Sequence, residues 1–535
     1  MSFENQLLNR LKDGPAQRVL FFLFLFLVFG FLVAAGKSAG FVWDETLYFG
    51  FARRTAEAFA LVLSDLKGFH LARAFEDLRD APAWKIYPQI GFLARYVQGF
   101  FYLCFHSLLG DPWAFRAGSA FLWTGMLYFL FRISGDAFGK GAGWLAMAVA
   151  LGFPRLLGHA FLGTTESALL LMWTAGIFFY LKCFRGEWPA WVFGVFFGLA
   201  MTAKFQVFGL LLGATAWGMF FDRRTASRML AWAALLGPVV FLAVQPCYWL
   251  DPFPILRVYF GQWVFHNKFA VPLYFLREQI RGHGPWFYSP LILAFTIPLP
   301  YFLLGLRGAY DAVVEKNRDG LLFLCLGLTP LVMLMSPNAP AYDGERLFIQ
   351  AFPCWVLLAA GGILGLLKKI KINYASVLVL LFAFSFLVLA RTHPFYSEYY
   401  SLAAGGPAGA EKLGLETSYS MGGLNREGIR IINGTVPSGV NIGLKGYPEH
   451  LMALYQEIGW LRNDIRFTRK MDSSVDYLLV YFRQSDLDEI ETLKKMRPAA
   501  QVQFQDVTIF KLVEKHASPA KRAPGTFGVK AAGSD

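Results

Sequence analysis

Long apolar runs, separated by short basic clusters, are the feature that most constrains this chain. Twelve such runs lie within the first 390 residues, and about 20 apolar residues suffice for a helix to cross a bilayer. A soluble protein could not bury so much apolar surface. The pattern predicts a polytopic α-helical membrane protein and excludes a cytosolic enzyme or a disordered chain. The candidate spans are Val19–Ala35, Gly91–Leu109, Ala114–Phe131, Gly141–Leu157, Ser167–Tyr180, Pro189–Ala203, Val207–Phe221, Leu230–Val244, Phe287–Leu306, Gly320–Met335, Phe348–Leu367 and Tyr374–Ala390.

Charged residues are divided unevenly along the chain. The first 390 residues hold 53 of them and the last 145 hold 34, and the second proportion is that of an ordinary soluble domain. We therefore expect a multi-spanning domain over residues 1–390, with a long first outer loop at 36–90. An external α/β domain is expected over 391–515. Residues 516–535 are rich in Ala, Pro, Gly and Lys and are predicted to be disordered.

Alternating apolar and polar residues in the charge-rich part predict its secondary structure. Strands are expected at Val440–Leu444, Ile465–Thr468 and Tyr477–Phe482, with one or two more in Val502–Leu512. Helices are expected at Pro448–Ile458 and Leu487–Met496.

Basic clusters between the apolar runs indicate which side of the membrane each loop faces. Such clusters stay in the cytoplasm under the positive-inside rule, which accounts for the net charge of +13 without a nucleic-acid partner. Arg10, Lys12 and Arg18 hold the N-terminus inside in the same way. The clusters between the runs are Arg132/Lys140, Lys182/Arg185, Arg223/Arg224/Arg228, Arg307/Lys316/Arg318 and Lys368/Lys369/Lys371.

This assignment leaves one segment undecided. Residues 36–133 must begin outside and end inside, which needs an odd number of crossings, yet they hold two good apolar runs. Either one run is a re-entrant or interfacial helix, or a third crossing is poorly marked. The total is odd, 11 or 13 transmembrane helices, and the charge-rich tail lies outside. The amphipathic stretch Phe51–Arg79 suits helices that lie on the outer membrane face.

Two acidic positions face the outside in this topology. Asp44 and Glu45 directly follow the first span, and Glu166 begins a later one. Carboxylates at such positions can serve as a general base or help to hold a divalent cation. A solvated helix end explains the first pair equally well, and compensation of the helix dipole explains Glu166.

Basic groups lie on the same side. Lys204 separates two apolar runs, Lys85 precedes another, and Arg346 follows Asp343-Gly344-Glu345. Each is able to bind a phosphate at the membrane edge, although Lys204 is as well explained by contact with lipid headgroups. His393 leaves the last span, where helix capping is the default role.

Three classes of function fit a polytopic membrane protein. A transporter or lipid flippase would carry ionisable groups within its helices, whereas here they gather at helix ends on one side. A scaffold protein would leave the clustered outer acids unexplained. The mixed acidic and basic face suits an anionic lipid-linked substrate and a step that removes a proton.

The ordered motifs resemble the polyprenyl-phosphate-sugar-dependent membrane glycosyltransferases. This C-type superfamily includes protein O-mannosyltransferases and the aminoarabinose transferases of lipid A. The resemblance covers most of residues 19–420. Its segments are Asp44-Glu45 with Tyr48, Lys85-Ile86-Tyr87-Pro88, His159 through Glu166, Thr202-Ala203-Lys204, Pro285-Trp286-Phe287-Tyr288 with Pro298-Leu299-Pro300, Gly344-Glu345-Arg346 with Phe352-Pro353, and His393-Pro394-Phe395 with Tyr399-Tyr400.

The resemblance implies an inverting transfer of a sugar from a polyprenyl monophosphate to an acceptor hydroxyl, at the outer face of the plasma membrane of a prokaryote. The acceptor would be a lipid, a glycan or a protein. Asp44 is the expected base, and Glu166 would orient it, bind the sugar or share a metal site; no cofactor is certain, and a divalent metal stays open. The expected catalytic residues are Asp44, Glu45 and Glu166, and the expected donor-binding residues are Lys85, Lys204, Arg346, Tyr48 and His393.

Overall fold

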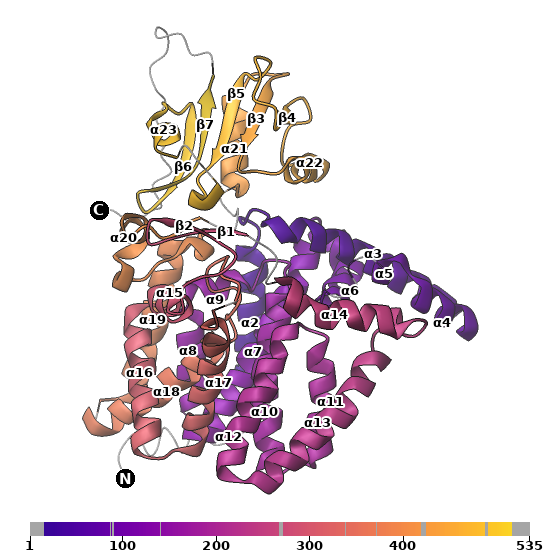
Figure 1. Cartoon of the computed structure of the whole chain (residues 1–535), viewed down its shortest axis with the longest axis vertical. Helices are drawn as coiled ribbons and strands as arrows, with labels where there is room; N and C mark the ends of the chain where they lie inside the picture. Colours follow the sequence, from indigo (N-terminus) through magenta and orange to yellow (C-terminus); the bar gives the residue numbers. More distant parts are fainter. Residues whose placement is uncertain are drawn as a thin grey trace.

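The chain folds into a helical bundle with a smaller α/β unit above one end (Figure 1). This is a computed structural model, and it describes residues 15–85, 87, 90–139, 141–266, 271–337, 339–370, 372–418, 424–486 and 490–515. The described chain begins at the lower end of the bundle in Figure 1, and the α/β unit lies beyond the upper end. The expected disorder of residues 516–535 and the basic residues Arg10 and Lys12 fall outside the described ranges.

Apolar helices form the bundle. Among the described residues, five helices are long and apolar enough to cross a membrane, namely 18–35 within α2, then α10, α13, α18 and α19. Glycines let α16 and α18 approach closely, because a Cβ at Gly308 would clash with the Leu358 carbonyl, as small residues commonly allow between membrane helices. The upright helices are α2 (Pro15–Ala35), α7 (Trp113–Phe138), α8 (Ala142–Leu151), α10 (Glu166–Phe184), α11 (Ala190–Met201), α12 (Phe208–Phe221), α13 (Arg223–Ala243), α16 (Leu299–Val314), α17 (Arg318–Leu334), α18 (Ala351–Ile370) and α19 (Tyr374–Thr392).

The loops that carry the basic clusters meet at the lower end of the bundle. Lys182, at the end of α10, lies 3.0 Å from the Asp136 carboxylate near the end of α7. Arg185 pairs with Asp319, in the first turn of α17. These ion pairs join loops that the charge pattern assigned to one side of the membrane.

The contacts of helix α6 (Phe92–Leu109) bear on which of the two apolar runs in 36–133 is unusual. In its first turn, Leu93 N donates to the Thr202 carbonyl at 3.2 Å. Gln98, in its middle, donates to the Thr164 carbonyl at 3.1 Å. Asp111, just past its end, pairs with Arg53 of α3 at 3.1 Å. Start, middle and end of α6 therefore all contact the upper end of the bundle, which favours the interfacial alternative over a crossing at Gly91–Leu109.

Other elements cover the same end. They include an unexpected hairpin, whose two turn residues, Leu276 and Arg277, both have positive φ values of 52° and 70°, as a tight two-residue turn requires. The elements are α3 (Trp43–Lys67), α4 (Leu71–Asp80), α5 (Pro82–Lys85), α9 (Pro154–Gly158), α14 (Pro252–His266), α15 (Tyr288–Thr296), α20 (Gly406–Leu413), β1 (Pro272–Phe275) and β2 (Glu278–Arg281).

The α/β unit contains a five-stranded sheet in the order β4-β3-β5-β7-β6. The strand β3 runs parallel to β4 and β5, while β7 is antiparallel to both of its neighbours. The expected strands and helices are confirmed, with residues 487–489 of the last helix lying outside the described ranges. The elements are β3 (Asn441–Lys445), β4 (Arg466–Thr468), β5 (Tyr477–Tyr481), β6 (Ala500–Phe504), β7 (Val507–Glu514), α21 (Arg426–Thr435), α22 (Glu449–Glu457) and α23 (Ile490–Lys495).

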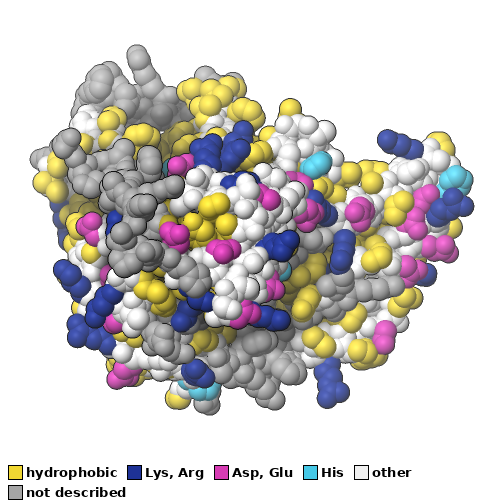
Figure 2. Space-filling model, turned by 90° about the horizontal axis from the view of Figure 1, so that it is seen from above, with side chains coloured by type: hydrophobic (Ala, Val, Ile, Leu, Met, Phe, Trp, Pro, Cys, Tyr) yellow, Lys and Arg dark blue, Asp and Glu magenta, His cyan; other side chains and the backbone are white. Residues whose placement is uncertain are grey.

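The α/β unit is joined to the helical part by buried contacts. Tyr455 of α22 accepts a hydrogen bond from the Phe41 backbone at 2.7 Å, and its ring packs on the Phe41 ring. Arg53 of α3 also pairs with Glu457. Figure 2 shows the molecule from above. Acidic and basic side chains are mixed with hydrophobic ones over this upper end and along the arm formed by α3 and α4.

Candidate active site

Arg346 joins two of the expected acidic residues. Its Nε donates to Glu166 Oε1 at 2.8 Å, and its Nη2 pairs with the Asp44 carboxylate. Asp44 lies in the first turn of α3, Glu166 is the first residue of α10, and Arg346 lies in the turn before α18. Burial alone would lower the pKa of Arg346, but the Asp44 and Glu166 carboxylates raise it well above its ordinary value. Arg346 therefore stays charged between them.

Lys204 approaches the same carboxylate. Its Nζ donates to Glu166 Oε1 at 2.9 Å, so both cations share one oxygen. The other oxygen, Oε2, is buried and has no hydrogen-bond partner among the described residues. The Glu166 side chain is 0% exposed, whereas that of Asp44 is 35% exposed. The cluster thus has a fixed, buried acid and an accessible one.

Tyr48 lies one helical turn beyond Asp44 on α3 and faces the same cluster. Burial raises the pKa of its hydroxyl, and the charges of Asp44 and Glu166 raise it further. Tyr48 therefore stays protonated and can donate a hydrogen bond. The structure brings together Asp44, Glu166, Lys204, Arg346 and Tyr48 from the expected set.

Glu45 points the other way and is occupied by Arg116. Arg116 Nε and Nη2 lie 2.7 and 2.8 Å from its two oxygens, and Gly163 N donates to it at 2.7 Å. Arg116 also donates to the carbonyls of Gly36, Ala39 and Gly40. Both side chains are buried, so this pair fixes the first outer loop against α7 and leaves Glu45 no free oxygen for a reaction.

A second buried pair supports the turn that carries Arg346. Arg155 of α9 pairs with Glu345 and donates from Nε to the Tyr399 carbonyl at 2.7 Å. Burial alone would raise the pKa of Glu345, but Arg155 and His159 together lower it to about 2.

Arg116 and Arg155 were not predicted from the sequence, although arginines in apolar surroundings are a usable signal because they require partners.

Two expected donor-binding residues are not part of this cluster as described. His393 lies 3.0 Å from Ser38 Oγ and 3.1 Å from the Tyr396 hydroxyl, away from Arg346. The side chain of Lys85 lies outside the described residues. Its backbone ends α5, and the flanking carbonyls of Ala83 and Tyr87 accept hydrogen bonds from buried Arg95.

A metal site does not fit these residues. No three acidic, histidine or cysteine side chains converge as ligands within the described ranges. The oxygens of Asp44 and Glu166 instead meet on the guanidinium of Arg346, which already supplies positive charge between them.

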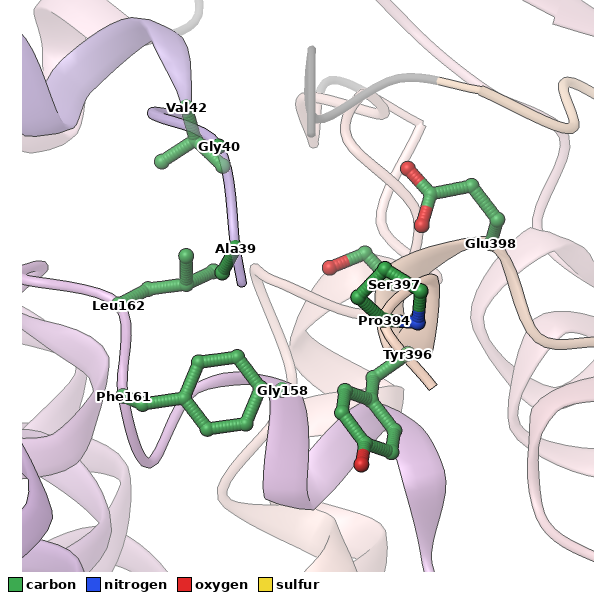
Figure 3. Close-up of a pocket in the computed structure, with 10 residues that line it drawn as sticks. All are labelled: Ala39, Gly40, Val42, Gly158, Phe161, Leu162, Pro394, Tyr396, Ser397 and Glu398. Atoms are coloured by element: carbon green, nitrogen blue, oxygen red, sulfur yellow. The ribbon is translucent and has the colours of Figure 1, made fainter. Parts of the chain in front are cut away.

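A small pocket lies between the first outer loop, the segment 158–162 and the segment 394–398. Figure 3 shows Ala39, Val42 and Phe161 facing Tyr396 and Glu398 across it. Its cavity volume is about 20 Å³, whereas ligand sites commonly hold about 300–1,000 Å³. We assign it no role in donor binding.

Comparisons with known proteins agree with this architecture. The family model described as dolichyl-phosphate-mannose-protein mannosyltransferase matches residues 87–249. No curated protein matches the chain in sequence at a significant level. The solved structure of ArnT from Cupriavidus metallidurans in the apo state is 14% identical and has a TM-score of 0.51, over 93% of this chain and 98% of that one.

The same protein bound to undecaprenyl phosphate is 15% identical, with a TM-score of 0.50 over 95% of this chain and 100% of that one. At this identity the likeness is one of fold. Together, the family model and the shared fold confirm the resemblance of this chain to the C-type superfamily of membrane glycosyltransferases.

Proposed function

We propose that the protein is an inverting glycosyltransferase that moves a sugar from a polyprenyl monophosphate to an acceptor hydroxyl. The observation that carries this proposal is the convergence of Arg346 and Lys204 on Glu166, with the accessible Asp44 on the other side of Arg346. Two cations beside the ends of apolar helices suit the phosphate of a membrane lipid. The similar fold that binds undecaprenyl phosphate supports the same class of lipid here.

The donor phosphate would compete with Asp44 for Arg346. The phosphate of the donor is a diester with one negative charge, and its two free oxygens accept bidentate hydrogen bonds from arginine. Its binding to Arg346 and Lys204 would release Asp44, which is the less buried of the two acids. Asp44 then becomes a free carboxylate at the moment when a base is needed.

The transfer itself exchanges two bonds at the anomeric carbon. The acceptor oxygen attacks from the face opposite the phosphate and gives its proton to Asp44. The bond between the anomeric carbon and the phosphate oxygen breaks, and its electron pair stays on the phosphate, where Arg346 and Lys204 stabilise the charge. Glu166 Oε2, which has no partner among the described residues, would accept a hydrogen bond from a sugar hydroxyl.

The position of the charges speaks against the alternative of a transporter or flippase. Asp44 and Glu166 each lie in the first turn of a helix, Lys204 lies three residues beyond α11, and Arg346 lies in a turn. A transport path would place such groups near the middle of the membrane.

We further propose eleven crossings, a cytoplasmic N-terminus and an external α/β domain over 391–515.

Lipids and surface glycans of cells that lack the protein test this function. Mass spectrometry should find that one glycan or lipid has lost a sugar and that a polyprenyl-phosphate sugar accumulates. The wild-type protein should reverse both changes, while Asp44→Asn should reverse neither at equal abundance in the membrane. Identical glycans and identical polyprenyl-phosphate sugars with and without the protein would overturn the proposal.

A further inference from the structure

Arg483 of the α/β unit reaches a carboxylate that holds Arg346. It lies two residues after β5, and its Nη2 lies 3.2 Å from Asp343 Oδ1. The other oxygen of Asp343, Oδ2, accepts from Arg346 Nη1 at 3.3 Å. The two guanidiniums therefore share one carboxylate, and the three side chains connect the α/β unit to the proposed phosphate site.

The backbone of the turn that carries Asp343 adopts an uncommon conformation that neighbouring contacts must stabilise. Asp343 and Gly344 both have positive φ values, 52° and 61°, and a residue other than glycine persists there when its surroundings hold it. Tyr288 donates from its hydroxyl to the Gly344 carbonyl at 3.2 Å. Arg483 and Arg346 hold the Asp343 side chain. The conformation just before Arg346 thus depends on contacts from several parts of the chain.

Arg483 is itself fixed at its other side. Its Nε donates to Glu416 Oε1 at 2.9 Å, and Ser485 contacts the same oxygen. The next residue, Gln484, bonds the backbone and the hydroxyl of Thr417. The side chain of Arg483 is 11% exposed. Its charge is therefore held in place at the boundary between the α/β unit and the bundle.

We propose that Arg483 is a positioning residue for Arg346, acting through Asp343, so that the α/β domain takes part in binding the donor phosphate. The proposal rests on the proposed function. While Arg483 shares the Asp343 carboxylate, this carboxylate holds Arg346 only in part. Without Arg483, Asp343 pairs with Arg346 alone and competes more strongly with an incoming phosphate.

Binding of undecaprenyl phosphate to the purified full-length protein in nanodiscs tests this role. Arg483→Gln should raise the Kd for this lipid about fivefold, whereas Arg483→Lys should recover part of the affinity. In an Asp343→Asn background, Arg483→Gln should have no further effect on the Kd, because residues that act through one another are not additive. Equal effects in both backgrounds would overturn the relay.

Two variants separate positioning from general stability. Arg430→Gln removes an arginine that is 68% exposed and pairs with Glu427 of the same helix, α21, and it should leave the Kd unchanged. Glu416→Gln weakens the other contact of Arg483. It should lower the thermal midpoint and change the Kd only a little. If the wild type does not bind undecaprenyl phosphate, the proposed function fails as well. If the wild type binds it and Arg483→Gln binds it equally well, the positioning role alone fails.

Discussion

Arg346 Nε lies 2.8 Å from Glu166 Oε1, and its Nη2 pairs with Asp44. Glu166 is completely buried and also holds Lys204, whereas Asp44 is partly exposed and pairs with Arg346. An incoming anion therefore displaces Asp44 more readily than Glu166. The same arginine would both bind the donor and control when the base is free.

Asp44→Asn separates binding from chemistry. We expect kcat for sugar transfer to fall by about 10²–10⁴, the usual contribution of a general base. The Kd for undecaprenyl phosphate should stay equal or fall, because Arg346 loses a competing carboxylate. Transfer assays and equilibrium binding on one purified preparation measure both quantities.

The matched control for this variant is Asp506→Asn. Asp506 lies in the exposed turn between β6 and β7, with a φ of 68° that asparagine also tolerates, so both constants should keep their wild-type values. A large rise in the Kd of Asp44→Asn, with kcat unchanged, would contradict the assignment of Asp44 as the base.

Lys204→Met removes one of the two cations. A hydrogen bond to a charged group contributes about 1.5–3 kcal/mol, so the Kd for undecaprenyl phosphate should rise about 10–100-fold. Lys182→Met, at the opposite end of the bundle, is the control and should bind the lipid normally. If both variants bind it equally well, Lys204 contacts headgroups of the bulk membrane instead of the donor.

Glu45→Ala should act on stability. It would leave the buried guanidinium of Arg116 without its carboxylate, and breaking such a pair commonly costs about 3–5 kcal/mol. We expect a lower thermal midpoint and less protein in the membrane, in contrast to the well-folded Asp44→Asn. Glu57→Ala, an exposed position on the same helix, should unfold like the wild type. A stable Glu45→Ala that has lost transfer would return Glu45 to the reacting groups.

Much of this architecture could be predicted because its signals are local. Apolar runs indicate the bundle, basic clusters indicate the lower loops, and alternation indicates the strands of the α/β unit. The position of the run Gly91–Leu109 could not be predicted in this way, because the run is apolar enough to resemble a span. Its place at the upper end depends on contacts with Thr164 and Thr202, which come from distant loops.

The site was predictable in part for a similar reason. Asp44, Glu166, Lys204 and Arg346 were identified by charge at the ends of apolar runs. Adjacent residues on a helix point about 100° apart, so Asp44 meets Arg346 while Glu45 meets Arg116. No sequence pattern could separate them, because each partner lies far along the chain.

The Glu345 carboxyl predicts an acid-sensitive component of stability. Its folded pKa is lowered from 4.5 to about 2 by Arg155 and His159, against the effect of burial. Stability from this group is therefore complete above pH 4.5, and it is lost as the pH falls toward 2, because the unfolded chain takes up the proton first. The difference in thermal midpoint between the wild type and Glu345→Gln should be largest above pH 5 and shrink in acid. A difference independent of pH would contradict the pairing.

The position of α6 predicts a labelling pattern. Its two ends contact the upper end of the bundle, so Ile90→Cys and His106→Cys, each in a cysteine-free chain, should both react with a membrane-impermeant maleimide in intact spheroplasts. Asp506→Cys in the α/β unit should react under the same conditions. Glu315→Cys, in the lower loop between α16 and α17, should react only after the membrane is permeabilised.

This pattern decides the number of crossings through parity. If α6 crossed the membrane, Ile90→Cys and His106→Cys would react from opposite sides, and a further crossing would be needed between residues 36 and 133 to keep the lower loops together. Reaction of both from outside leaves α7 as the one crossing in that stretch, which gives eleven in total. Reaction of Asp506→Cys only after permeabilisation would instead move the α/β unit, and with it Arg483, to the cytoplasmic side and would contradict the whole assignment.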